Sequence, residues 1–248
     1  MKVQSIDDVI DELGTIVTLC RAENSRLAFF PALYRKTTIR VKEGIACGRF
    51  EDGQRMESLD VVFANRYLEA FKQLRRGEQP TKSWAYAFEL ADASHPLIVQ
   101  HLLLGMNAHI NLDLGIAAVE TSPAGELSTL RRDFFEINNI LAELLGEVQS
   151  DLGELSPLMR LLDGLLGPAD EALSNFSIRK AREAAWERAE TLTGLQTEAV
   201  PDKIEDFDQE VADFAQVICP RDGLLVSVMA MVRSAESDDV RAITDILL

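Results

Sequence analysis

Residues 95–109 contain all three histidines of the chain, and the last of them opens a polar run inside an apolar segment. His109 and Asp113 are four residues apart, a spacing that places both side chains on one face of an α-helix. An imidazole and a carboxylate suit Zn²⁺, Mn²⁺ or Fe²⁺, and they equally suit a general base with its orienting acid. They also suit a buried hydrogen bond that locks two helices together.

Further polar residues share this segment. His101 lies on the same broad face as His109, but about 12 Å along a helix axis separates them, too far for one metal ion. Asn107 and Asn111 repeat the four-residue spacing on nearly the opposite face. Because an unpaired buried polar group costs roughly 1–3 kcal/mol, a core helix rarely carries so many of them. We therefore predict a polar centre with His109, Asp113 and His101 as catalytic candidates and the two asparagines as ligand-binding candidates.

Other segments offer residues that could complete this centre. The carboxylates that could add metal ligands to His109 and Asp113 are Asp60, Glu120 and Asp133. The arginines that could bind an anionic ligand are Arg49, Arg66, Arg179 and Arg182. Such arginines also pair with acids across helix bundles, and acids are plentiful in this chain.

Composition excludes several classes of function. The net charge of −16, from 41 acidic and 25 basic residues, argues against nucleic acid and anionic membranes as partners. The glycine-rich stretch 44–53 matches neither a P-loop nor a dinucleotide fingerprint, so no nucleotide cofactor is expected. Three scattered cysteines and a polar, acidic start to the sequence favour a protein of the cytoplasm.

The apolar residues follow the helical period through most of the chain, which predicts an all-α fold. Ser5 is expected to cap the first helix, and Gly77 to end the third. The expected helices span about residues 6–20, 25–42, 56–74, 81–91, 96–119, 128–152, 157–166, 174–194, 204–218, 223–233 and 238–247.

The segment Pro96–Val119 is predicted to be the buried centre of a single bundle. It is apolar enough to suggest a membrane span, but it contains His101, His109 and Asp113, which favour a core helix. The polar stretch 196–203 is the best internal boundary. It divides a helical core domain, residues 1–195, from an acidic helical extension, residues 196–248, that packs on the core.

Three motifs resemble an uncharacterised bacterial family known only as a domain of unknown function. They are GIACGRF at residues 44–50, FANRYL at 63–68 and QHLLLGMNAHINLDL at 100–114. Asp133-Phe134 and Arg182 with Trp186 fit the same family, and the resemblance extends over about residues 27–193. It implies an all-helical fold and carries no activity, so no residue receives a role from it.

A weaker likeness concerns mechanism. His109 and Asp113 look like a pair on the buried helix of zinc-dependent phospholipases C and single-strand nucleases. A trinuclear zinc site of that kind needs many histidines, and none follows His109 in this chain. A mononuclear site or a carboxylate-rich dinuclear site stays open.

The sequence therefore leaves three hypotheses. The first is a metal-assisted enzyme, most simply a hydrolase, acting on a small molecule that the candidate arginines suggest to be anionic. The second is a metal-free enzyme or binder with His109 as base, Asp113 as its orienting acid and arginines holding an anion. The third is a structural or interaction protein whose polar centre only locks helices together.

Overall fold

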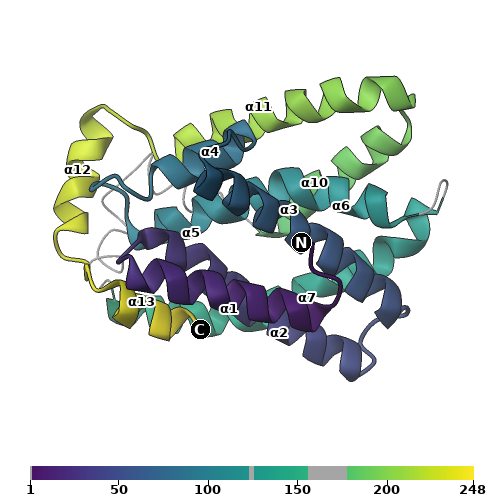
Figure 1. Cartoon of the computed structure of the whole chain (residues 1–248), viewed down its shortest axis with the longest axis horizontal. Helices are drawn as coiled ribbons and strands as arrows, with labels where there is room; N and C mark the ends of the chain where they lie inside the picture. The colour runs from purple at the N-terminus through teal and green to yellow at the C-terminus, as the bar shows by residue number, and fades with distance from the viewer. Residues whose placement is uncertain (1, 123–125, 156–177) are drawn as a thin grey trace.

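The chain folds into helices, as the periodicity predicts, and the described residues contain no strand. The computed structural model describes residues 2–122, 126–155 and 178–248 (Figure 1). Its α-helices are α1 (Ile6–Ala22), α2 (Phe29–Ala46), α3 (Gly53–Arg76), α4 (Lys82–Glu89), α5 (Ile98–Met106), α6 (Leu114–Thr121), α7 (Leu127–Leu155), α10 (Ile178–Thr193), α11 (Val200–Ile218), α12 (Leu224–Arg233) and α13 (Val240–Leu247). The helix expected at 157–166 and the start expected near 174–177 lie outside the described residues.

Local sequence signals fix several helix ends. The Ser5 hydroxyl accepts a hydrogen bond from the Asp8 amide, and the Asp8 carboxylate accepts one from the Ser5 amide, each at 3.1 Å. This reciprocal cap satisfies two backbone donors that the first turn leaves free. Gly77 ends α3 with a φ of 72°, a conformation that glycine adopts without strain. Ser25 caps a short 3₁₀ turn, Arg26–Ala28, and α2 begins only after it.

The central helix runs without a break from Ile98 to Thr121 through α5, a π-helical segment (Asn107–Asp113) and α6. It begins at Ile98, two residues after Pro96, so the predicted start of this helix is two residues too early. The helix is long and apolar enough to cross a membrane, but 78% of its most apolar stretch is buried inside the fold. The prediction of a buried central helix is confirmed.

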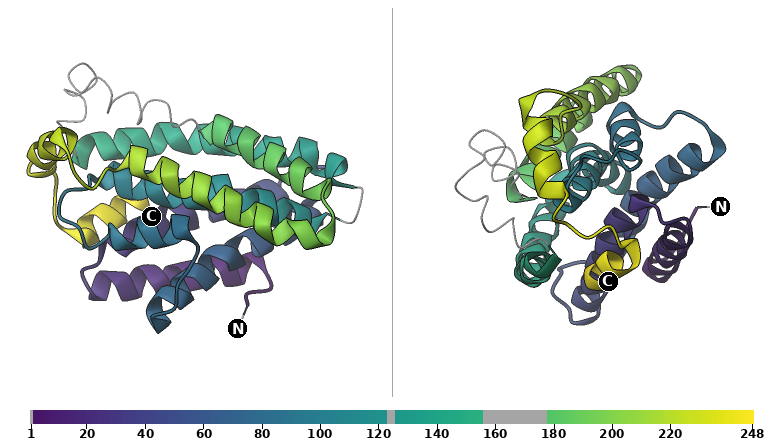
Figure 2. Two further views of the ribbon diagram at one scale, coloured as in Figure 1. Left: turned by 90° about the horizontal axis from the view of Figure 1, so that it is seen from above. Right: turned by 90° about the vertical axis from the view of Figure 1, so that its left-hand side faces the viewer.

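Four apolar clusters surround the central helix, which explains why it is apolar on every side. Leu102 packs with α1 and α2, and Leu114 packs with α7 and α10. Leu104 contacts the cluster of α4 and α11, and Ile116 packs between α10 and α11. The view along the bundle in Figure 2 shows α1 and α13 on one side and α11 on the other. Any polar side chain on this helix must therefore find a partner inside the protein.

The last helices share the core of the first ones. Val240 and Ile243 of α13 are buried in the same cluster as Val9 and Leu13 of α1. Arg21 of α1 donates hydrogen bonds to Thr244 and Asp245, which hold α13 beside α1. Figure 1 shows this pairing at the lower face of the molecule. Helix α11 lies across α4 and the π-helical segment, so residues after 196 help to enclose the central helix.

Candidate functional site

His109 and Asp113 contact each other, as their spacing predicts. The Nδ1 atom of His109 lies 3.3 Å from the Oδ2 atom of Asp113, and both residues are buried. They belong to the π-helical segment, a rare form of helix that is frequent at functional sites.

The Asp113 carboxylate has two further partners. Its Oδ1 atom accepts a hydrogen bond from Nε of Arg66 at 2.9 Å, and its Oδ2 atom accepts one from Nε1 of Trp84 at 2.8 Å. Burial raises the pKa of Asp113, but the His109 hydrogen bond and the Arg66 charge outweigh it, so the pKa lies below its ordinary value. Asp113 is therefore ionised at neutral pH, and its negative charge is fully engaged by these three donors.

The His109 ring lies in an aromatic cage. It stacks on Phe63 with ring centres 3.5 Å apart, and its centre lies 4.6 Å from that of Tyr34. Burial lowers the pKa of His109 and outweighs the opposing effect of Asp113, so the imidazole is neutral at neutral pH. Because ionised Asp113 requires a donor, the proton of the ring sits on Nδ1, and Nε2 keeps its lone pair.

His109 also lines a cavity. The cavity has a volume of about 90 Å³ and is lined by residues of α2, α3, the central helix, α7 and α10. Its walls are mainly apolar, with side chains such as Leu33, Leu59, Ile110 and Leu141. A space of this size is large enough for several water molecules or a small organic group.

Four of the residues that line the cavity each carry a buried polar atom with no hydrogen-bond partner among the described residues. These atoms are Oη of Tyr34, Oδ2 of Asp60, Nε2 of His109 and Nε of Arg182. Each would cost roughly 1–3 kcal/mol if it stayed unpaired, which makes four in one apolar cavity an unusual arrangement. The sequence named Asp60, His109 and Arg182 as candidates, and the fold brings all three to one cavity.

Near neutral pH, Tyr34 is protonated and Asp60 is protonated in part. Burial, aided by the neighbouring charge of Glu57, raises the pKa of Asp60 from 3.8 to about 7. Burial, with the charges of Asp60 and Asp113, holds the pKa of Tyr34 well above its ordinary value. Near neutral pH the wall therefore carries a hydroxyl donor and a carboxyl group that exchanges its proton there.

Asp60→Asn is expected to stabilise the protein at pH 8 and to leave its stability unchanged at pH 4. The folded chain binds the Asp60 proton more tightly than the unfolded chain, so stability falls as pH rises from about 4 to about 7. Asparagine does not titrate, so the variant avoids this loss in the free energy of unfolding, which amounts to at most about 4 kcal/mol. Thermal unfolding at both pH values measures the difference.

The exposed Asp11→Asn variant is the control and should give the same melting temperature as the unmodified chain at both pH values. An Asp60→Asn variant that unfolds no later than the unmodified chain at pH 8 would show that Asp60 is solvated or paired.

His101 lies apart from this cavity. It is buried, and it lines a second, smaller cavity of about 20 Å³ beside Arg26 and Phe88. Burial lowers the pKa of His101 to about 3, so this ring is neutral. Its Nε2 atom has no partner among the described residues. The fold therefore does not bring His101 together with His109 in one site.

Asn107 and Asn111 bond to each other and to the backbone. The Asn111 amide donates to Oδ1 of Asn107 at 2.8 Å, and the Asn107 amide donates to the Val211 carbonyl of α11 at 2.9 Å. Arg188 donates to the Asn111 carbonyl. These bonds join the central helix to α10 and α11, and neither asparagine lines the cavity of His109.

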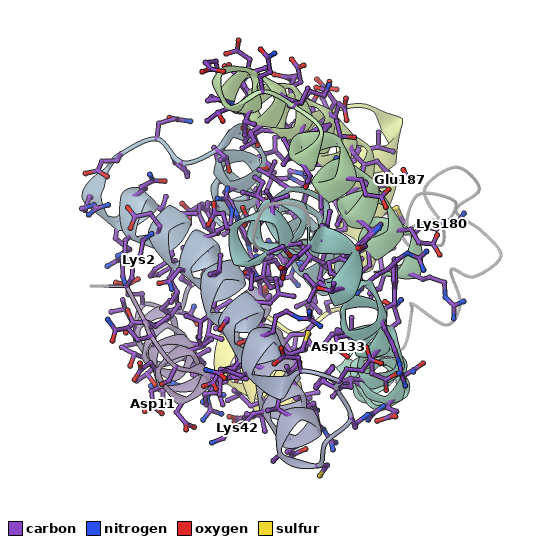
Figure 3. The ribbon with its side chains drawn as sticks, turned by 90° about the vertical axis from the view of Figure 1, so that its right-hand side faces the viewer. Lys2, Asp11, Lys42, Asp133, Lys180 and Glu187 are labelled. Carbon is purple, nitrogen blue, oxygen red and sulfur yellow. The ribbon has the colours of Figure 1, made fainter. Side chains whose placement is uncertain are left out.

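Two of the four candidate arginines lie away from the cavity. Arg49 forms ion pairs with Glu136 and Glu143, at 3.2 Å and 3.1 Å, near the protein surface. Arg179 is exposed on α10, next to Lys180, whose side chain points outward in Figure 3. Arg66 donates a hydrogen bond to Asp113. Of the four candidate arginines, only Arg182 lines the cavity.

Two of the carboxylates proposed as metal ligands have other roles. Asp133 of α7 accepts hydrogen bonds from the Glu51 and Asp52 amides at 2.8 and 3.0 Å, just before the start of α3 (Figure 3). Glu120 is exposed and lies 3.6 Å from Nη1 of Arg66.

These residues do not fit the metal site that the sequence suggested. No group of three or more His, Cys, Asp and Glu side chains in the described residues is placed to hold a metal ion. Both oxygens of Asp113 already accept hydrogen bonds from Arg66, Trp84 and His109. A zinc, manganese or iron ion at this carboxylate would have to displace those donors.

Sequence reasoning missed Tyr34, Phe63 and Trp84. Trp84 carried the clearest signal, because a buried indole usually finds a hydrogen-bond acceptor inside the protein. Tyr34 and Phe63 carried no such signal, because each lies on the apolar face of its helix, where ordinary core packing explains an aromatic side chain equally well.

A model of a family of unknown function, DUF5995, matches residues 6–220. The match includes the central helix and every residue that lines the cavity. It extends beyond the resemblance seen in the sequence motifs at both ends. No curated protein and no solved structure matches the chain. Because the match covers most of its length, the chain belongs to the DUF5995 family.

Proposed function

We propose that this protein is a metal-free enzyme that binds a small, mainly apolar molecule and uses His109 as a general base. One observation carries the proposal: four residues that line one apolar cavity each have a buried polar atom with no hydrogen-bond partner among the described residues. Ligand sites commonly combine an apolar wall with a few placed polar groups. A ligand that supplies acceptors and donors would remove the cost of leaving these atoms unpaired.

His109 has the arrangement of a base with an orienting acid. The Nδ1–H group of His109 donates to Oδ2 of Asp113, which lies 3.3 Å from Nδ1, and stacking on Phe63 fixes the plane of the ring. Nε2 is left as the acceptor of a ring that lines the cavity, and the positive charge gained on proton uptake would be stabilised by Asp113. Arg66 and Trp84 fix the position of Asp113 in turn.

Tyr34 and Asp60 offer the complementary donors. A hydroxyl and a protonated carboxyl on an apolar wall can donate hydrogen bonds to a ligand oxygen. A base on one residue and donors on two others suit the removal of a proton next to a carbonyl group. In that step the C–H bond electrons form a C=C bond, the carbonyl oxygen gains negative charge, and His109 receives the proton.

The contacts favour this proposal over a purely structural lock. In a purely structural network the polar groups form hydrogen bonds within the protein, as Asn107 and Asn111 do with each other and with Val211. In the His109 network, the Asp113 carboxylate accepts hydrogen bonds on both oxygens. The Nε2 atom of His109 has no partner among the described residues. The metal-assisted alternative has less support, because the described residues supply no ligand set at this position.

Deuterium exchange tests the proposed reaction. The purified protein is incubated in D₂O with a panel of small ketones and aldehydes, and ¹H NMR follows the loss of their α-protons. We expect catalysed exchange with at least one panel member and a loss of about a hundredfold or more in His109→Gln. His101→Gln is the matched control, because it alters another buried, partnerless histidine outside the cavity, and exchange should continue.

Two results would contradict the proposal. One is exchange that persists in His109→Gln at the rate of the unmodified protein. The other is the absence of exchange with every compound of the panel in the unmodified protein, with no compound binding in the cavity.

A further inference from the structure

We infer that the ligand of this cavity carries a single carboxylate, which pairs with Arg182, on a short apolar body. The inference rests on the proposed function and adds the chemical class of the ligand. It starts from Arg182, a buried arginine that forms no ion pair with an acid of the described residues.

Arg182 is only 4% exposed and projects from α10 toward the cavity. Its Nη2 atom donates to the Phe134 carbonyl, and its guanidinium lies 4.5 Å from the centre of the Phe134 ring. Its Nε atom is buried and has no hydrogen-bond partner among the described residues. Burial lowers the pKa of Arg182 to about 9, which leaves the guanidinium charged at neutral pH.

No carboxylate of the described residues forms an ion pair with Arg182. Arg233 provides the contrast, because it is the other buried arginine and it pairs with Glu236 and Asp238. Arg66, which is partly exposed, pairs with Asp113. A buried charge without a counter-charge is costly, so the position favours an anion that enters from outside.

The surroundings of Arg182 select the kind of anion. A guanidinium binds a carboxylate through parallel hydrogen bonds, and one positive charge balances one negative charge. A phosphate group carries more charge and more acceptors than this single cation can satisfy. The neighbouring walls are apolar, with Ile137, Leu141 and Ile178 lining the same cavity. A carboxylate on a hydrocarbon body matches both features.

The cavity volume limits the length of that body. About 90 Å³ is less than the roughly 150 Å³ of an apolar cavity known to hold benzene. Asp60 and Arg182 both line this cavity. We therefore expect a short acid of about four carbon atoms, with no more heavy atoms than benzene, to fit better than a longer one.

Ligand-observed NMR titration with butyrate, 3-methylbutyrate and hexanoate tests the inference, with butyramide and inorganic phosphate as comparison probes. The unmodified protein should bind at least one of the acids and bind butyramide and phosphate about tenfold more weakly or not at all. Arg182→Met keeps the length of the side chain and removes its charge. It should lose the preference for acid over amide.

Two further variants separate loss of charge from loss of fold. Arg182→Lys keeps the positive charge and should retain part of the affinity for the acid. Arg179→Met, an exposed change on the same helix, should bind all probes as the unmodified protein does. Thermal unfolding of each variant shows whether it is folded, and Arg182→Met should be at least as stable as the unmodified chain because an unpaired buried charge is removed.

The outcomes distinguish this inference from the proposed function. Equal binding of butyrate and butyramide by the unmodified protein refutes the role of Arg182 but keeps the cavity as a binding site. Stronger binding of phosphate than of any acid refutes the choice of a carboxylate. Binding of no organic probe, together with no deuterium exchange, refutes the proposed function as well.

Discussion

Asp113→Asn is expected to abolish proton transfer at His109 and to destabilise the fold by about 2–4 kcal/mol. The carboxylate accepts hydrogen bonds from Arg66, Trp84 and His109. An asparagine amide has only one acceptor oxygen and brings its own N–H donors toward these three donors. Arg66 also loses its buried counter-charge. His109 loses the acceptor that keeps its proton on Nδ1, so the tautomer that acts as base is no longer favoured.

Chemical denaturation and the deuterium-exchange assay measure these two effects separately. Glu120→Gln is the matched control, because it removes the other, exposed carboxylate near Arg66. Its effect on stability should stay within about 0.5 kcal/mol, since exposed ion pairs contribute little. An Asp113→Asn variant that keeps both its stability and its exchange rate would show that the buried network is not needed.

Gly105→Ala is expected to destabilise the protein by at least about 2 kcal/mol and to alter both cavities. A Cβ atom at this position would lie 2.4 Å from Cδ2 and 2.9 Å from Cβ of Phe30. The second distance prevents a simple rotation of the ring, so α2 and the central helix must move apart. Phe30 lines the cavity of His109 and also the smaller cavity of His101, which makes its displacement visible at both sites.

Thermal unfolding measures the stability loss, and NMR shifts of the His101 and His109 rings report the movement of Phe30. Gly194→Ala is the control, because the added Cβ atom would meet its nearest neighbour at an ordinary 3.6 Å. A Gly105→Ala variant with unchanged melting temperature and ring shifts would mean that α2 adapts to the added methyl group at no cost.

Most of the fold follows from local sequence signals. The capping pair of Ser5 and Asp8 and the left-handed Gly77 both fix ends where the sequence predicts them. The central helix was predictable from its length and apolar character. Its π-helical segment was not, because the apolar residues around Asn107–Asp113 fit an α-helix equally well. The predicted start of the central helix at Pro96 is two residues too early, because a proline just before a helix and one in its first turn look alike in sequence.

The candidate site was predictable only in part, because its residues come from distant segments. His109 and Asp113 were found from their spacing, which local geometry turns directly into a contact. Asp60 and Arg182 share a cavity with His109 only because of the way in which α3 and α10 pack on the central helix. Arg49 had the same chemistry as Arg182 in the sequence, but acids of α7 neutralise it near the surface. Asp113 illustrates the same limit, since only the fold reveals Arg66 and Trp84 as its partners.

The pairing of α13 with α1 has a consequence for the order in which the protein matures. Helix α13 lies beyond residue 220, where the family match ends, yet Val240 and Ile243 cover the apolar side chains of α1 and α2. During synthesis the first helices therefore leave the ribosome more than 190 residues before the helix that covers them. Until residues 240–247 emerge, that apolar face is open to chaperones and to neighbouring nascent chains. A truncation anywhere before Val240 would remove the covering side chains, so this apolar face would stay exposed after synthesis ends.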